Sequence, residues 1–168
     1  KATQVEVELI DDDALLASAL AASEARAALD AAEGHLLAEL ERRQLCDREL
    51  GLSTVSWLAD RTHGARGPIT GRVKTATRLR VALGEVDQAL ADGRITADHA
   101  RVLADAVANP RIADQIADLQ HDLIELAGEC PYRVWRAHVA RLVELLDQDR
   151  GYDPNADLGR NKLRITPL

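Results

Sequence analysis

Length, composition and charge place this chain among helical proteins with a single core. Its 168 residues suffice for one domain or two small helical lobes, and a 46% hydrophobic content without Phe or Met favours helices built from Ala and Leu. The acidic first residues argue against a signal peptide, and the longest apolar run, Ala14–Ala22, is too short for a membrane span. We predict an all-α protein without a membrane partner. Because Cys46 and Cys130 lack metal-ligand spacing, we expect free thiols and a cytoplasmic location.

Residues 1–12 alternate apolar and polar side chains over much of their length, and we expect an extended N-terminal arm there. From Asp13 to Leu50 the apolar residues recur at spacings of three, four and seven, which predicts a long helix. One side of such a helix is longer than a compact core, so it either wraps around its neighbours or pairs with a copy of itself. A homodimer through this helix is one of the expected partnerships.

Two helices joined by a turn come next along the chain. Gly51 ends the long helix, Ser53 caps a short one, and a turn over residues 62–67 leads to a longer helix that starts at Pro68. This order is typical of a helix-turn-helix, in which the second helix enters the major groove of DNA. We predict a helix-turn-helix-like unit over residues 53–83.

The remaining sequence predicts more helices and then a linker. Gly, Pro, Asn and Asp dominate from residue 150 onward, and residues 162–166 resemble the first strand of a further module. The predicted helices cover residues 85–91, 96–109, 111–127 and 131–147. The predicted domains are an arm over 1–12, a helical domain over 13–149, and a linker with the start of a downstream module over 150–168.

Basic residues gather between Arg61 and Arg80. This stretch carries six Lys and Arg and no Asp or Glu, whereas the rest of the chain has 15 basic against 28 acidic residues, a net charge of −13. A DNA duplex, with about one negative charge per 1.7 Å, favours such a local cationic surface. We therefore expect DNA as a partner, and six neutralised phosphates would give a log–log salt slope near −5, as an order of magnitude.

The helix that follows the turn has one apolar and one polar side. At 100° per residue, Ile69, Val73 and Ala76 share a face, and Arg80 falls within it, where we expect it to pair with an acid. The opposite side is cationic and hydroxylated, with groups that contact phosphates or base edges. The predicted DNA-binding residues are Thr70, Lys74, Thr77 and Arg78 in the groove, and Arg61, Arg66 and Arg72 on flanking phosphates.

Two other interpretations of the same residues stay open. Carboxylates from other helices could balance the basic face, so the DNA-binding hypothesis requires that Lys74 and Arg78 are not held by such carboxylates. Alternatively, the chain is a dimerisation or scaffolding module that binds no nucleic acid, and its basic stretch meets an acidic patch on a partner subunit.

Three segments carry a resemblance to a known family. They are residues 51–62 (GLSTVSWLADRT), 73–79 (VKTATRL) and 89–100 (ALADGRITADHA). The chain resembles the helical domain of unknown function that precedes HNH endonuclease modules in actinobacterial repeat-family (REP-type) proteins, over most of residues 30–168. The resemblance implies a domain coupled to a downstream HNH nuclease.

A second, partial likeness concerns residues 83–103, with GRIT at 93–96 and His99-Ala100-Arg101. This stretch is similar to the segment that follows the helix-turn-helix of ParB-like chromosome-partition proteins, in which the two preceding helices bind DNA. The likeness implies a bracing helix before the turn and a reading helix after it. The turn expected here, His63–Gly67, is longer than the usual one.

The sequence contains no catalytic cluster of its own. An HNH nuclease needs a metal-binding histidine and a second histidine as general base, but the five histidines here are scattered without an adjacent pair. We expect no catalytic residue, metal site or cofactor in this chain, so cleavage would belong to a full-length HNH protein. His99 is expected to have a structural role at the start of its helix, and Trp57 and Trp135 are expected in the core.

Overall fold

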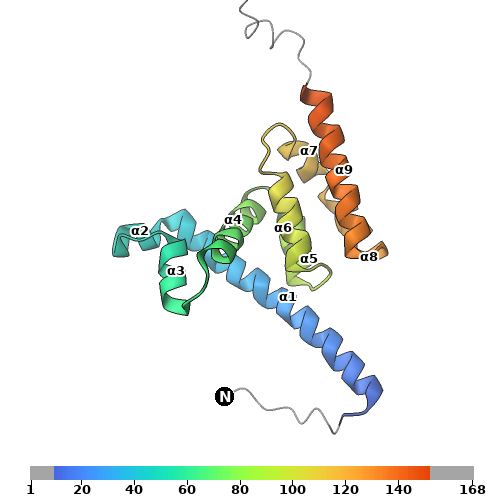
Figure 1. Ribbon diagram of the computed structural model, residues 1–168, viewed down its shortest axis with the longest axis horizontal. Coiled ribbons are helices and arrows are strands. Elements are labelled where there is room, and N and C mark those ends of the chain that lie inside the picture. Colours follow the sequence, from blue (N-terminus) through green and yellow to red (C-terminus); the bar gives the residue numbers. More distant parts are fainter. Residues whose placement is uncertain (1–9, 152–168) are drawn as a thin grey trace, which may run out of the picture.

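The structure, a computed structural model, describes residues 10–151, and every regular element in this part of the chain is a helix (Figure 1). The predicted all-α class is confirmed, and none of the described helices is both long and apolar enough to cross a membrane. The expected arm at residues 1–9 and the expected linker and strand at 152–168 lie outside the described residues. The helices are α1 (Asp12–Arg43), α2 (Leu45–Leu50), α3 (Thr54–Thr62), α4 (Arg66–Ala82), α5 (Gly84–Ala91), α6 (Ala97–Ala106), α7 (Ala113–Asp118), α8 (Gln120–Glu129) and α9 (Tyr132–Gly151).

Side-chain caps fix several of the helix starts. The Asp11 carboxylate accepts a hydrogen bond from the Ala14 backbone N–H at 2.9 Å, and the Ser53 hydroxyl accepts one from the Ser56 N–H at 3.1 Å. At the start of α6, Thr96 and His99 form a reciprocal capping box. Ser53 and Thr96 had been expected to cap these helices from the sequence.

Three predicted boundaries are wrong. The helix expected over residues 13–50 breaks at Gln44, whose φ of 49° is left-handed, so α1 and α2 are separate. The helix expected over residues 111–127 is likewise two helices, α7 and α8, which meet at Leu119. Pro68 is the third residue of α4 and not its first, because the helix already begins at Arg66.

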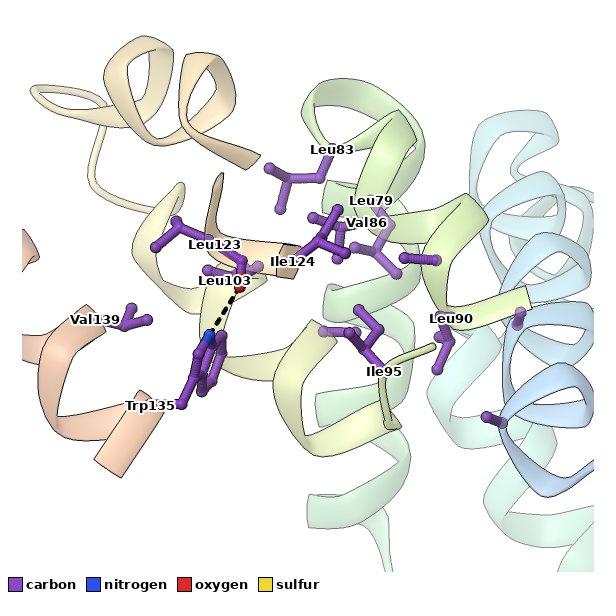
Figure 2. Packing of buried hydrophobic residues seen from close by; sticks show 14 residues of the cluster. Leu79, Leu83, Val86, Leu90, Ile95, Leu103, Leu123, Ile124, Trp135 and Val139 are labelled. Carbon is purple, nitrogen blue, oxygen red and sulfur yellow. Dashed lines mark hydrogen bonds between the residues drawn. The ribbon is translucent and has the colours of Figure 1, made fainter. Parts of the chain in front are cut away.

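The main core lies where α1, α4, α5, α6, α8 and α9 meet (Figure 2). Trp135 is fully buried there, and its Nε1–H donates a hydrogen bond to the Leu123 carbonyl at 2.9 Å, which satisfies its only polar atom. A smaller cluster joins α1, α3 and α4 around Ile69 and Val73. The predicted core position of Trp135 is confirmed, whereas Trp57 on α3 is only half-buried.

The first half of α1 projects away from the body of the protein (Figure 1). From Asp11 to Arg26 every side chain is exposed except half-buried Ala14, and Leu16 and Leu20 are 71% and 63% exposed. The helix joins the core only from Ala27 onward. This part of α1 therefore lacks the packing that normally stabilises a helix in a protein. An isolated helical segment of this length is only marginally stable in water.

Candidate nucleic-acid interface

Three residues, His63, Gly64 and Ala65, join α3 to α4, two fewer than the five expected from the sequence. The Gly64 N–H donates to the Ala59 carbonyl at 3.2 Å, and His63 has a left-handed φ of 54°. A Cβ on Gly64 would lie 2.9 Å from the Thr62 Oγ1 and 3.1 Å from the Ile69 Cδ1, so glycine suits this close approach. A short turn that contains glycine is typical of a helix-turn-helix.

Helix α4 contacts α1, α3, α5, α6 and α7, and the part of its surface between α3 and α6 that carries exposed residues is called the open sector here. At 100° per residue, Arg66, Thr70, Lys74 and Thr77 lie within one strip of this sector. On one border Arg66 donates a hydrogen bond to the Ser56 hydroxyl on α3, and on the other α4 is tied to α6. The open sector therefore carries four of the residues predicted to bind DNA.

Three of the six basic residues in the acid-free stretch pair with carboxylates from other helices. The Arg78 guanidinium lies 2.7 Å from Asp105 on α6, Arg72 donates to both oxygens of Glu33 on α1 at 2.7 Å, and Arg80 lies 2.7 Å from Glu39. The expectation for Arg80 is confirmed. The requirement that Arg78 stay unpaired is not met, because Asp105 is distant in sequence but adjacent in the fold.

The other three cations, Arg61, Arg66 and Lys74, are exposed, and within the described part of the chain none lies within 4.0 Å of a carboxylate. The requirement placed on Lys74 is therefore met. These side chains come from the end of α3, the start of α4 and its middle, so they flank the short turn on both sides. Their positive charge is available to an anionic partner without the loss of an internal ion pair.

The two predicted threonines are oriented differently from the expectation. The Thr70 hydroxyl donates to the Arg66 carbonyl at 2.8 Å, and the Thr77 hydroxyl donates to the Val73 carbonyl at 2.9 Å. Both residues are half-buried. Because each hydroxyl proton is used within α4, neither hydroxyl is free to donate to a phosphate.

The Glu39 carboxylate interacts with three arginines. Arg42 and Arg43 donate hydrogen bonds to its carboxylate, and Arg80 approaches from α4. The hydrogen bonds from Arg42 and then Arg43 lower the pKa of Glu39 well below its usual range. The carboxylate therefore stays ionised and holds the end of α4 against α1.

A second basic surface lies on α9, where sequence analysis predicted none. Residues 131–143 contain three arginines and no Asp or Glu, a short repeat of the signal found at 61–80. Arg133 and Arg136 are exposed and have no carboxylate partner among the described residues, whereas Arg141 pairs with Glu144. These arginines are visible in the sequence, but a net charge of −13 summed over all residues outside 61–80 does not reveal them.

The described residues contain no group of three or more His, Cys, Asp or Glu side chains arranged to hold a metal ion. Cys46 is buried and Cys130 is half-buried, and both are free thiols. His63 lies exposed in the turn, and His99 is buried in the capping box. The expected structural role of His99 is confirmed by that cap.

Comparison with known proteins gives a family and no activity. A family model with the description "Domain of unknown function (DUF222)" matches residues 16–167. No curated protein and no solved structure matches the chain. The resemblance found in the sequence is thus confirmed as far as a domain of unknown function. Because the match spans nearly the whole length, the chain belongs to the DUF222 family.

Proposed function

We propose that this domain binds DNA through the α3–turn–α4 unit. The observation that carries the proposal is the set of exposed cations around a three-residue glycine turn, Arg61, Arg66 and Lys74, which have no carboxylate partner among the described residues. In the proposal Lys74, an exposed residue in the open sector of α4, faces the groove and the two arginines contact flanking phosphates. Thr70 and Thr77, which are half-buried on the same strip of α4, contribute apolar contact with base edges in this proposal.

Arg72 and Arg78 contribute less to this interface than the sequence suggested. An exposed ion pair contributes only about 0–1 kcal/mol, so a phosphate can compete for either guanidinium. However, Glu33 or Asp105 would then remain beside the phosphate and repel it. These two arginines therefore serve the proposed interface as weak outer contacts.

The likeness to domains that precede HNH modules suggests what DNA binding does in the full-length protein. In the proposal the domain holds DNA and is itself non-catalytic, while an HNH module of the full-length protein cleaves it. The full-length gene product tests this arrangement: metal-dependent cleavage should require the HNH histidines, and alanine variants on α4 should weaken DNA binding without removing the nuclease chemistry.

The binding proposal is tested by titrating a duplex of about 20 base pairs at several salt concentrations. Three neutralised phosphates predict a log–log salt slope of about −3. The double variant Arg66→Ala with Lys74→Ala should make the slope shallower by about 2 and lower affinity about tenfold or more at low salt. Both positions are exposed, so the fold should persist.

The matched control is Arg133→Ala with Arg136→Ala, which removes the same charge from the exposed face of α9. This control should bind DNA like the wild type. A chain with no measurable affinity at ~50 mM salt would contradict DNA binding altogether. Loss of affinity in the α9 variant alone would instead move the interface to α9.

Self-association through α1 is a second candidate function. It is favoured by apolar side chains that α1 exposes along one side, among them Leu29 and Leu36 at 70% and 69% exposure. Runs of exposed apolar side chains of this kind mark contact surfaces. Mass measurement in solution tests it directly, because a chain that stays monomeric at about 100 µM would contradict it.

A further inference from the structure

An outward-facing apolar stripe runs along α1 with a period of seven residues. It consists of Leu15, Ala22, Leu29 and Leu36, and small residues stand between them at Ser18, Ala25 and Ala32. The stripe lies on the side of α1 opposite Ala27 and Ala31, which face the core. Leu29 and Leu36 are each about 70% exposed. A seven-residue repeat is the pattern by which one helix packs along another.

The stripe leads directly into an apolar groove. The groove has a volume of about 520 Å³ and lies between the second half of α1 and the α2–α3 segment. Leu36 and Leu40 form its floor on α1, and Leu45, Trp57 and Leu58 line it from the other side. Trp57 is half-exposed in this groove, which is why its expected core position is not met. The stripe and groove therefore form one continuous apolar surface.

We propose that a second copy of this chain covers this surface, with the two α1 helices antiparallel and the projecting end of each seated in the groove of the other. This inference rests on the self-association proposed above and specifies its geometry. The arrangement places Ser18, Ala22 and Ala25 of one copy opposite Leu36, Ala32 and Leu29 of the second. None of these three pairs places one large side chain against another, which permits close helix packing. Leu15 enters the second copy's groove beside Leu36 and Leu40.

Charge distribution favours the antiparallel direction. In this register Asp11 and Asp12, at the start of α1, lie near Arg43 and Arg42 at the end of the second copy's α1. Both arginine side chains are more than half exposed, but each already pairs with Glu39 of its own helix, so the added attraction is small and the repulsion in a parallel pair carries the argument. A parallel pair would instead bring the three aspartates Asp11–Asp13 of one copy against those of the other, which is repulsive.

A second copy fits better than an unrelated partner because the chain carries both halves of the contact. It has a projecting apolar helix end without cover in the described structure, and a groove on the same stripe of α1 that accepts a helix. One two-fold rotation covers the groove and the stripe side of the projecting end in both copies, as in an isologous dimer, while Leu16 and Leu20 on the other side of α1 stay outside the contact. Figure 1 shows the projecting end of α1 clear of the other described helices, so it can reach a second body.

The test combines solution mass with cysteine cross-linking. Chains with Ala22→Cys and chains with Ala32→Cys are mixed under reducing conditions and then oxidised; the proposal predicts a disulfide between positions 22 and 32. The Ala22→Cys chain alone should not link to itself, because its two copies of position 22 would lie about 15 Å apart along the axis, beyond disulfide reach. The unsubstituted chain controls for linking through Cys46 and Cys130.

The outcomes distinguish the antiparallel docking from self-association in some other arrangement. A dimer with the 22-to-32 disulfide supports both. A dimer in which Ala22→Cys links to itself, or in which the mixture does not link, overturns the antiparallel docking but leaves self-association intact. A monomer at about 100 µM overturns both. Leu29→Glu should abolish the dimer, whereas Val81→Glu, at a 79% exposed position on α4, should not.

Discussion

At the scale of single residues, His99 serves the helix start and the core together. Its Nδ1 accepts a hydrogen bond from the Thr96 N–H at 3.3 Å, and its ring meets Tyr132 and Trp135 edge-on at centroid distances of 4.9 and 4.6 Å. The side chain is 9% exposed, and its Nε2 has no hydrogen-bond partner among the described residues. Burial lowers the pKa of His99, and the Asp98 charge only partly opposes this effect.

This pKa shift predicts a loss of stability in mild acid. In the unfolded chain His99 has its ordinary pKa of 6.5, so below that pH the unfolded state binds more protons than the folded state. The free energy of unfolding should therefore decrease as pH falls from about 7.5 to 5.5. His99→Gln keeps an acceptor for the Thr96 N–H without titrating, so its melting temperature should depend less on pH. A variant that melts with the wild-type pH dependence would contradict this role.

The ion pairs of α4 show which contacts between residues can be predicted from the sequence. Arg80 falls within the apolar face of its helix, and that position alone predicted an acidic partner. Nothing comparable marked Arg72 and Arg78, because their partners Glu33 and Asp105 are 39 and 27 residues away and meet them only through helix packing. The positions on α4 were predictable, but their neutralisation by other helices was not.

At the scale of elements, the ion pair between α4 and α6 limits what Arg78 adds to the proposed DNA interface. Asp105 holds Arg78 at 2.7 Å, and Arg78 is only 28% exposed. Asp105→Asn removes the competing charge while it keeps the shape of the side chain. If α4 contacts DNA, affinity should rise about fivefold, or about 1 kcal/mol, and the salt slope should steepen by about 1.

The same titration of duplex against salt measures this effect. Asp114→Asn is the matched control, because Asp114 is an exposed acid on α7 without an ion pair among the described residues. Equal gains in the two variants would show that only net charge matters. No gain in Asp105→Asn would contradict a DNA contact at this end of α4.

Helix boundaries were predictable where local chemistry marks them. Ser53 and Thr96 cap their helices as side chains of this kind usually do, and Gly93 ends α5 with a left-handed φ of 72°. The breaks at Gln44 and Leu119 carry no glycine or proline, so tertiary packing, not local propensity, determines them. The sequence therefore predicted one helix where the fold has two at both sites.

At the scale of the whole molecule, the described residues divide into a packed body and a projecting end of α1 that none of them covers. Hydrogen exchange should distinguish these parts, because an uncovered helical segment opens easily. If α1 self-associates as proposed, amides from residue 16 to 23 should exchange slowly in the wild type. In Leu29→Glu they should exchange close to the rate of an unfolded peptide, while those from Ala31 to Leu40 stay protected. Equal protection in the two proteins would contradict a cover over this segment.

Gly93 determines where the helix end leaves the body. A Cβ at this position would lie 3.3 Å from the Glu24 Cα, so the turn between α5 and α6 touches the α1 backbone directly. About 12 residues, or roughly 18 Å of helix, extend from Glu24 to the start of α1, so a small change of angle at this contact is amplified at the N-terminal end of the helix. A tilt of roughly 10° at Gly93 would swing the tip of α1 by about 3 Å. The close contact between the α5–α6 turn and Glu24 thus determines the direction in which the N-terminal segment of α1 leaves the body.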